Sequence, residues 1–306
     1  MNLFKEQISG QKDWARLYQS IPAFTALVEH IMAKEKLPMA SIKNLSPGTN
    51  AVFRVGSYVV KVFAPEESGY GLILDLETEL FATRRANRLN VSAPNVIADG
   101  FVEDKYHFPY MITEYIEGIE FGEAVKTMTD AQKYDFGQKL RSITDKMNTP
   151  CEPFNGVDVI NDKGRYRRWD PYPQQFREER LEYIKSHNYD EMVFVHGDLC
   201  EDNILLTPEG EVYIIDFADA VLAPVIYEHT LIAFYVFEFG SALLKGYFGD
   251  LSKDDYFEML FDGLLIHDFG GDMVKDYIGK PEEFRTLEDF KVGLYAKLGA
   301  LLDGKK

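Results

Sequence analysis

Cysteine is scarce in this chain, which has two, Cys151 and Cys200, among 306 residues. Two distant cysteines make neither a multi-disulfide framework nor the paired spacing of a zinc site. We therefore expect a reducing compartment, the cytoplasm. Long apolar runs are also missing, because none reaches the roughly 20 residues that a membrane-spanning helix needs. The first residues, MNLFKEQISGQKDW, lack the apolar core of a signal peptide, so no association with a membrane is expected.

Positive charge is in short supply as well. The chain has 33 Lys and Arg residues against 50 Asp and Glu, a formal net charge of −17. Binding to nucleic acid needs a basic surface, so this class of partner is excluded. The acidity is compatible with a cationic small-molecule substrate, although it can equally serve solubility alone. No feature predicts a protein partner.

The apolar pattern divides the chain into a sheet-rich part, residues 1–117, and a helical part, residues 118–306. In the first part, helical spacing over 12–36 breaks near Pro22, and then short strands alternate. Residues 51–63 predict a hairpin around Gly56, 72–89 a helix, and 96–115 a second hairpin. In the second part Thr129 can cap a helix that runs to Met147. The fold class is therefore α+β, with an antiparallel sheet that carries one key helix, followed by a mostly helical lobe.

Lys61 lies inside an apolar strand, YVVKVF. A buried ammonium is costly unless an anionic group pairs with it. Glu79, on the following helix, can supply that partner, and Glu77 is the competitor on another face of the same helix. Lys61 could instead lie on an edge strand and extend its charged end to water.

Two polar turns follow short apolar runs later in the chain. VHGDLCEDNILL (195–206) places Asp198 five residues before Asn203, and YIIDFADA (213–220) ends its apolar run at Asp216. A hairpin between the runs brings Asn203 and Asp216 to one end of a sheet, as a shared metal requires. Phosphoryl transfer needs such groups: a lysine on the phosphates, oxygen ligands on Mg²⁺, and a carboxylate facing the attacking hydroxyl. His196 is expected to be a structural hydrogen-bonding residue behind the loop.

The ordered set HGDLCEDN and IIDFAD, with Lys61 and Glu79 before it, resembles the aminoglycoside phosphotransferase family. These enzymes are small-molecule relatives of protein kinases, so the resemblance implies a bilobal protein-kinase-like fold with ATP, or GTP, and Mg²⁺ as cofactors. It implies that Asp198 is the catalytic base and that Asn203 and Asp216 are the Mg²⁺ ligands. Lys61, paired with Glu79, would contact the nucleotide phosphates.

The resemblance also places the rest of the nucleotide site. It implies that the backbone of Glu114 and Ile116, in the connector MITEYIEG, binds adenine. The loop expected to cover the phosphates, SPGTNAV, has a single glycine rather than G-x-G-x-x-G, so its grip is expected to depend on Ser46, Thr49 and Asn50. No Ala-Pro-Glu triplet follows Asp216, which counts against a protein kinase.

The leading hypothesis is a kinase that phosphorylates a hydroxyl of a small molecule, expected to be a cationic, aminoglycoside-like antibiotic. A metabolite kinase of the same fold, acting on choline, homoserine or a sugar, is the alternative. A nucleotide-binding protein without turnover is a third hypothesis, and the intact set of catalytic residues counts against it. Glu228, Glu238, Asp262, Asp268 and Asp272 are candidate carboxylates for a cationic acceptor.

Overall fold

The computed structural model describes residues 2–46, 48–70, 73–189 and 191–304. The chain forms two compact units. The first comprises residues 1–117 together with 215–219, and the second comprises 118–214 together with 220–306. The short segment 215–219, which contains Asp216, therefore belongs structurally to the first unit although it lies late in the sequence.

An antiparallel five-stranded sheet forms the centre of the first unit, with the strand order β1-β2-β3-β5-β4. The strands are β1 (Ile42–Asn44), β2 (Ala51–Val55), β3 (Tyr58–Val62), β4 (Val96–Glu103) and β5 (His107–Glu114). Both predicted hairpins are confirmed. Gly56 forms the turn between β2 and β3 with a φ of 62°, a conformation that glycine adopts at little cost.

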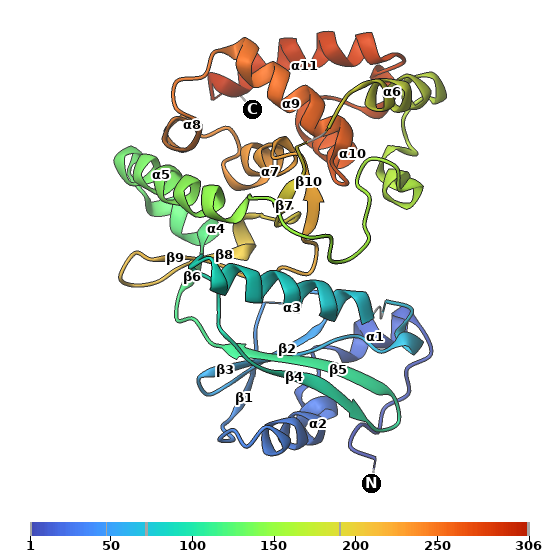
Figure 1. Cartoon of the computed structure of the whole chain (residues 1–306), viewed down its shortest axis with the longest axis vertical. Coiled ribbons are helices and arrows are strands. Elements are labelled where there is room, and N and C mark those ends of the chain that lie inside the picture. Colours follow the sequence, from blue (N-terminus) through green and yellow to red (C-terminus); the bar gives the residue numbers. More distant parts are fainter. Residues whose placement is uncertain (1, 47, 71–72, 190, 305–306) are drawn as a thin grey trace. The chain divides into compact units, whose positions relative to one another are not determined.

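Helices cover both faces of this sheet (Figure 1). On one face lies α3 (Ile73–Arg88), whose Leu80 packs against Phe63 and Met111. On the other face lie α1 (Gln11–Leu17) and α2 (Ile21–Lys34). The predicted break near Pro22 is the start of α2, because Ser20 caps that helix and proline is tolerated in a first turn.

The second unit is mostly helical, as the sequence predicted. The Thr129 hydroxyl accepts the Gln132 N–H and the Gln132 side chain bonds back, a capping box that begins α5. The helices are α4 (Phe121–Ala124), α5 (Asp130–Met147), α6 (Gln174–Ser186), α7 (Ile226–Leu231), α8 (Ser241–Phe248), α9 (Lys253–Ile266), α10 (Gly270–Met273) and α11 (Leu287–Leu302).

Five short strands complete the second unit and position its loops. β7 (Val193–Val195) pairs with β10 (Val221–Ala223), and β8 (Ile204–Leu206) lies between β6 (Ile119–Glu120) and β9 (Val212–Ile214). The loop with Asp198 thus starts at β7 and ends at β8. The fold is α+β and protein-kinase-like. In the described ranges we find no helix with the length and apolarity needed to cross a bilayer.

Candidate active site

Lys61 lies on β3, a central strand, between Val52 of β2 and Met111 of β5. The residue is 6% exposed, which excludes the edge-strand alternative. Its Nζ lies 2.7 Å from Oε2 of Glu79 and 2.8 Å from Oδ1 of Asp216. Burial by itself lowers the pKa of Lys61, but the two carboxylates outweigh burial and raise that pKa above its usual range. The lysine is therefore a permanently charged, positioned cation.

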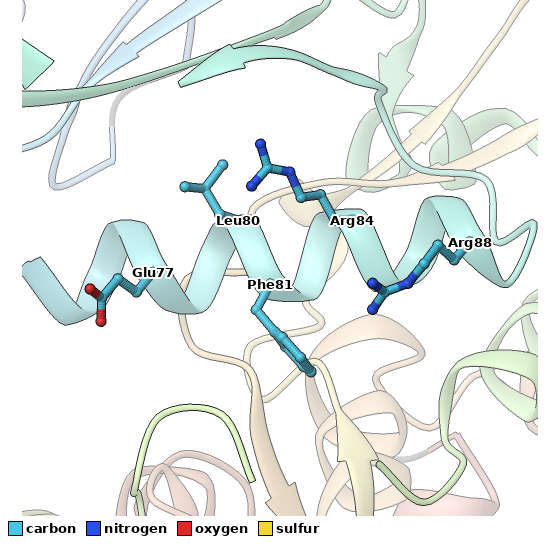
Figure 2. A pocket seen from close by; sticks show the side chains of 5 residues that line it. All are labelled: Glu77, Leu80, Phe81, Arg84 and Arg88. Atoms are coloured by element: carbon cyan, nitrogen blue, oxygen red, sulfur yellow. The ribbon is translucent and has the colours of Figure 1, made fainter. Parts of the chain in front are cut away.

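Glu79, not Glu77, is the partner of Lys61. The two residues lie on different faces of α3. Glu77 is exposed and lines a shallow pocket together with Phe81, Arg84 and Arg88, as Figure 2 shows. Glu79 is 3% exposed and faces the lysine. Burial raises the pKa of Glu79, the charge of Lys61 opposes that shift, and the negative charge of Asp216 adds to it.

Negative charge exceeds positive charge around Lys61. Within the first unit Asp75 and Asp219 also act on this cluster, and the pKa of Asp75 is raised to about 6 by burial and then by the charge of Asp219. Glu79 and Asp216 contact the ammonium, and Asp75 and Asp219 add further negative charge nearby. The side chain of Asp216 is 45% exposed, and its φ of 60° is an uncommon conformation for a residue other than glycine. This local excess of negative charge and these hard oxygen donors fit a divalent cation such as Mg²⁺.

The turn between β7 and β8 holds Asp198 and Asn203 in a fixed relation. Nδ2 of Asn203 donates to the backbone carbonyl of Asp198 at 2.7 Å, and more weakly to Oδ2 at 3.4 Å. A carbonyl can only accept, so the amide nitrogen points at it and the amide Oδ1 points away. An amide oxygen oriented in this way is a suitable Mg²⁺ ligand type. Among the described residues no three His, Cys, Asp or Glu side chains form a metal cage by themselves.

His196 has the structural role that the sequence predicted. Its side chain is fully buried, and Nδ1 accepts the backbone N–H of Asp198 at 3.3 Å. Gly197 follows with a φ of 84°, where a side chain would strain the backbone. The two residues together turn the chain sharply, so that Asp198 leaves the end of β7 partly exposed.

Glu228, on α7, makes a structural contact with the Asp198 loop that sequence reasoning missed. It was a candidate for contact with the acceptor, but it is 0% exposed. Its two oxygens accept the backbone N–H groups of His196 at 3.2 Å and Gly197 at 3.1 Å. Burial raises the pKa of Glu228 to about 7, the two N–H bonds oppose that shift, and the charge of Asp198 adds to it. A charged residue inside the apolar run VIYEHTLIAF was the signal in the sequence.

The other candidate carboxylates of the second unit already have partners. The Tyr183 hydroxyl donates to Asp262 at 2.7 Å, and Arg168 binds Asp272 and lies 4.0 Å from Asp268. Glu238 accepts a long hydrogen bond of 3.5 Å from the Tyr277 hydroxyl.

Residues expected at the nucleotide all lie in the first unit. Ser46 and Thr49 are exposed, whereas Asn50 is 7% exposed and its Oδ1 accepts the backbone N–H of Ala64 at 3.1 Å. Pro47, in the same loop, lies outside the described residues. At the end of β5 the Glu114 N–H donates to the Asn95 carbonyl at 3.0 Å, and the partly exposed Ile116 follows two residues later.

The structure therefore brings the predicted residues together in two groups. Lys61, Glu79 and Asp216 converge in the first unit, and Asp198 and Asn203 converge in the second. Ion pairs hold the side chains of the first group in place, and a hydrogen bond to the backbone holds those of the second.

A model of the phosphotransferase enzyme family matches residues 41–261, which is most of the chain. A search of curated proteins found no match. Solved structures with the same fold include two aminoglycoside phosphotransferases. The GDP complex of wild-type aminoglycoside 2'-phosphotransferase-IIIa is 16% identical, with coverage of 92% of this chain and 97% of that one and a TM-score of 0.58. The ternary complex of streptomycin, ATP and APH(2″)-IIa is 17% identical, with coverage of 86% and 97% and a TM-score of 0.58.

A choline kinase has the same fold at a similar level of likeness. LicA from Streptococcus pneumoniae is 15% identical, with coverage of 90% of this chain and 98% of that one and a TM-score of 0.54. Identities this low show a shared fold and do not establish which acceptor this chain uses.

Proposed function

The chain belongs to the phosphotransferase enzyme family, and from that premise we propose that it moves the γ-phosphate of ATP or GTP to a hydroxyl of a small molecule. The observation that carries this proposal is the buried Lys61 ammonium, held 2.7 Å from Glu79 and 2.8 Å from Asp216. Burying a cation is energetically costly. Phosphoryl transfer uses a lysine of this kind to contact the polyphosphate of the nucleotide.

In this proposal the first unit binds the nucleotide. Lys61 contacts the phosphates, while Glu79 keeps its side chain extended. The exposed loop at Ser46 and Thr49 covers the phosphates, Asn50 tethers that loop, and the backbone of Glu114 and Ile116 takes adenine or guanine. Structures with the same fold have been solved with GDP and with ATP, which supports a nucleotide of either base.

Asp198 acts as the general base. Its carboxylate accepts the proton of the acceptor hydroxyl while the hydroxyl oxygen attacks the γ-phosphorus and the nucleoside diphosphate leaves. Asn203 holds the loop of Asp198 through its amide nitrogen. The amide oxygen of Asn203 and the carboxylate of Asp216 would hold Mg²⁺, whose charge neutralises the phosphate oxygens when it is bound.

For the acceptor we propose an aminoglycoside-like cation. A net charge of −17 attracts cations, and structural neighbours are complexes with streptomycin, kanamycin and gentamicin. The second candidate, a metabolite kinase, is favoured by neighbours that are choline kinases or choline/ethanolamine kinase family proteins. Choline is also a cation with a hydroxyl, so the two candidates share the same electrostatic requirement.

The experiment that tests the proposal is a screen for nucleotide consumption. Wild-type protein is incubated with ATP or GTP and Mg²⁺ and with aminoglycosides, choline, ethanolamine, homoserine or neutral sugars. Any product is identified by ³¹P NMR, and Asp198→Asn serves as the inactive control. Nucleotide binding without turnover of any acceptor would favour a non-catalytic nucleotide-binding protein.

Salt dependence separates cationic from neutral acceptors. The Debye length falls from about 30 Å at 0.01 M salt to about 8 Å at 0.15 M, so attraction of a cation to an acidic protein weakens across this range. We expect kcat/KM for the true acceptor to fall over this range while kcat changes little. A neutral acceptor with a flat salt profile would exclude the aminoglycoside-like substrate.

A further inference from the structure

Residues 3–34 form a helical cap that precedes the part of the chain matched by the family model, which starts at residue 41. We call this segment the N-terminal cap. It packs against the sheet through Phe4, Trp14 and Phe24, which are all buried. Its first residues are also tied to the turn between β4 and β5, where the carboxylate of Asp104 accepts the N–H of Phe4 at 2.8 Å. The cap is thus a fixed part of the first unit.

The cap bonds directly to the loop that we propose covers the nucleotide phosphates. The indole Nε1–H of Trp14 donates to the backbone carbonyl of Thr49 at 2.8 Å. At the other end of the loop, Nδ2 of Asn44 donates to the carbonyl of Gln19 at 3.1 Å. The cap therefore holds both ends of the loop through these two bonds.

The two ends of this contact differ in exposure. Trp14 is 1% exposed, and its ring packs edge-on against Phe24 at 5.9 Å and stacks with Tyr18 at 6.4 Å. Thr49 is exposed and lies in a loop without regular secondary structure. A buried donor thus bonds to the backbone of an exposed segment. Without the indole N–H the Thr49 carbonyl can turn to water, so the loop loosens while the cap remains packed.

The loop also lacks the several glycines that let the backbone of a glycine-rich loop approach phosphates closely. Gly48 is its single glycine. Backbone that is not shaped by a run of glycines depends on bonds from outside, here from Trp14 to Thr49 and from Ala64 to Asn50. The affinity for phosphate is then set by how well these bonds hold the loop before the nucleotide arrives.

We propose that Trp14 is a positioning residue of the nucleotide site: through its hydrogen bond to Thr49, the N-terminal cap sets the affinity of the phosphate-covering loop for nucleotide. This inference rests on the proposed function, because it takes Ser46 and residues 48–50 as a nucleotide-binding element. Trp14 is 1% exposed, so its effect on the nucleotide would be exerted through the loop.

The test uses Trp14→Phe, which removes the N–H and keeps an aromatic ring in the core. Loss of one neutral hydrogen bond corresponds to a roughly 2- to 10-fold change in an equilibrium constant. We expect KM for ATP and Kd for ADP to rise by that factor, while kcat and KM for the acceptor stay within about 2-fold. The matched control is Trp169→Phe, because Trp169 is equally buried, lies in the second unit, and its Nε1 has no hydrogen-bond partner among the described residues. It should leave the nucleotide constants unchanged.

Two further measurements keep the inference testable if Trp14→Phe folds poorly. The chain has two tryptophans, so Trp169→Phe leaves Trp14 as the sole tryptophan reporter, and its fluorescence should change saturably with ADP. Asn44→Ala, at an exposed bond, should raise Kd for ADP without lowering Tm.

The outcomes separate the inference from the proposed function. The inference would be overturned if a folded Trp14→Phe protein had unchanged KM for ATP and Kd for ADP. It would also be overturned if the fluorescence of Trp14 did not change with ADP. Either result would leave the proposed function intact. An equal rise in KM for both substrates would show a general structural effect and would also overturn it. Wild-type protein that binds no nucleotide by calorimetry would overturn the proposed function, and the inference with it.

Discussion

Substitution of Glu228 by glutamine tests whether a buried carboxylate holds the catalytic loop. In the native protein both oxygens of Glu228 accept backbone N–H groups, those of His196 and Gly197, directly before Asp198. Glutamine has nearly the same shape, but one oxygen becomes an NH₂ group, which cannot accept. One loop N–H then faces a donor inside the protein, where nothing replaces the lost partner.

The magnitude follows from the cost of that unsatisfied group. A buried donor left without an acceptor costs about 1–3 kcal/mol, equivalent to roughly 5- to 150-fold in a conformational equilibrium. The loop can avoid this cost by shifting away from Glu228, and Asp198 shifts with it. We therefore expect Glu228→Gln to lower kcat by a factor in this range, with little change in KM for ATP.

The pH dependence makes the prediction sharper. Burial raises the pKa of Glu228 to about 7, so in the native protein this group gains a proton as the pH falls through 7. The protonated acid has one donor and resembles glutamine, so wild-type kcat should fall on the acid side with an apparent pKa near 7. In the Glu228→Gln protein, kcat should be low at every pH and should lack the fall near pH 7 that titration of Glu228 causes in wild type.

Stability should respond in the opposite direction. A carboxyl group whose pKa is raised in the folded state binds its proton more tightly there than in the unfolded chain. Its contribution to the free energy of unfolding is therefore largest at low pH and is lost as the pH rises toward 7. Glutamine does not titrate, so Glu228→Gln should gain stability relative to wild type as the pH rises from about 5 to about 8.

The assay is kcat between about pH 5.5 and pH 9, together with urea unfolding at both ends of that range. Glu282→Gln is the control, because it makes the same chemical change at an exposed residue. Wild-type kcat in Glu228→Gln at neutral and alkaline pH would refute the role of Glu228 in holding the loop.

The remaining predictions concern the proposed catalytic groups. Asp198→Asn should keep Tm and nucleotide binding but lose about 10²–10⁴-fold in kcat, and turnover like that of wild type would remove Asp198 as the base. Asp216→Ala should weaken binding of Mg·ATP more than Asn203→Ala, because a carboxylate offers a metal a full charge and an amide only a dipole; unchanged affinity by calorimetry would contradict the ligand assignment. Lys61→Ala and Glu79→Ala should be non-additive by about 0.5–3 kcal/mol in a double-mutant cycle on nucleotide affinity, and strict additivity would argue against a functional pair.

Several parts of the first unit could be read from the sequence because their signals are local. The alternation of apolar residues predicted both hairpins, and the cost of burying an ammonium predicted an acidic partner for Lys61. The resemblance to the phosphotransferase family favoured Glu79 over Glu77, and the structure shows the ion pair with Glu79. Such predictions need only the sequence around a residue, or one partner on the next helix or strand.

Contacts that form across long stretches of the sequence needed the tertiary structure. Asp216 is a second partner of the Lys61 ammonium although 155 residues separate them. Glu228 binds the Asp198 loop 31 and 32 residues before it, and the indole of Trp14 reaches the carbonyl of Thr49.

The physical reason is the kind of group to which each side chain bonds. The residue types, their order and their periodicity along the chain determined which elements form and which charged groups need partners. Glu228 and Trp14 instead bond to the peptide backbone, and a backbone N–H or carbonyl is the same at nearly every residue. No residue type in the loops of Asp198 or Thr49 marks those bonds, so only the packing of distant segments decided where they form.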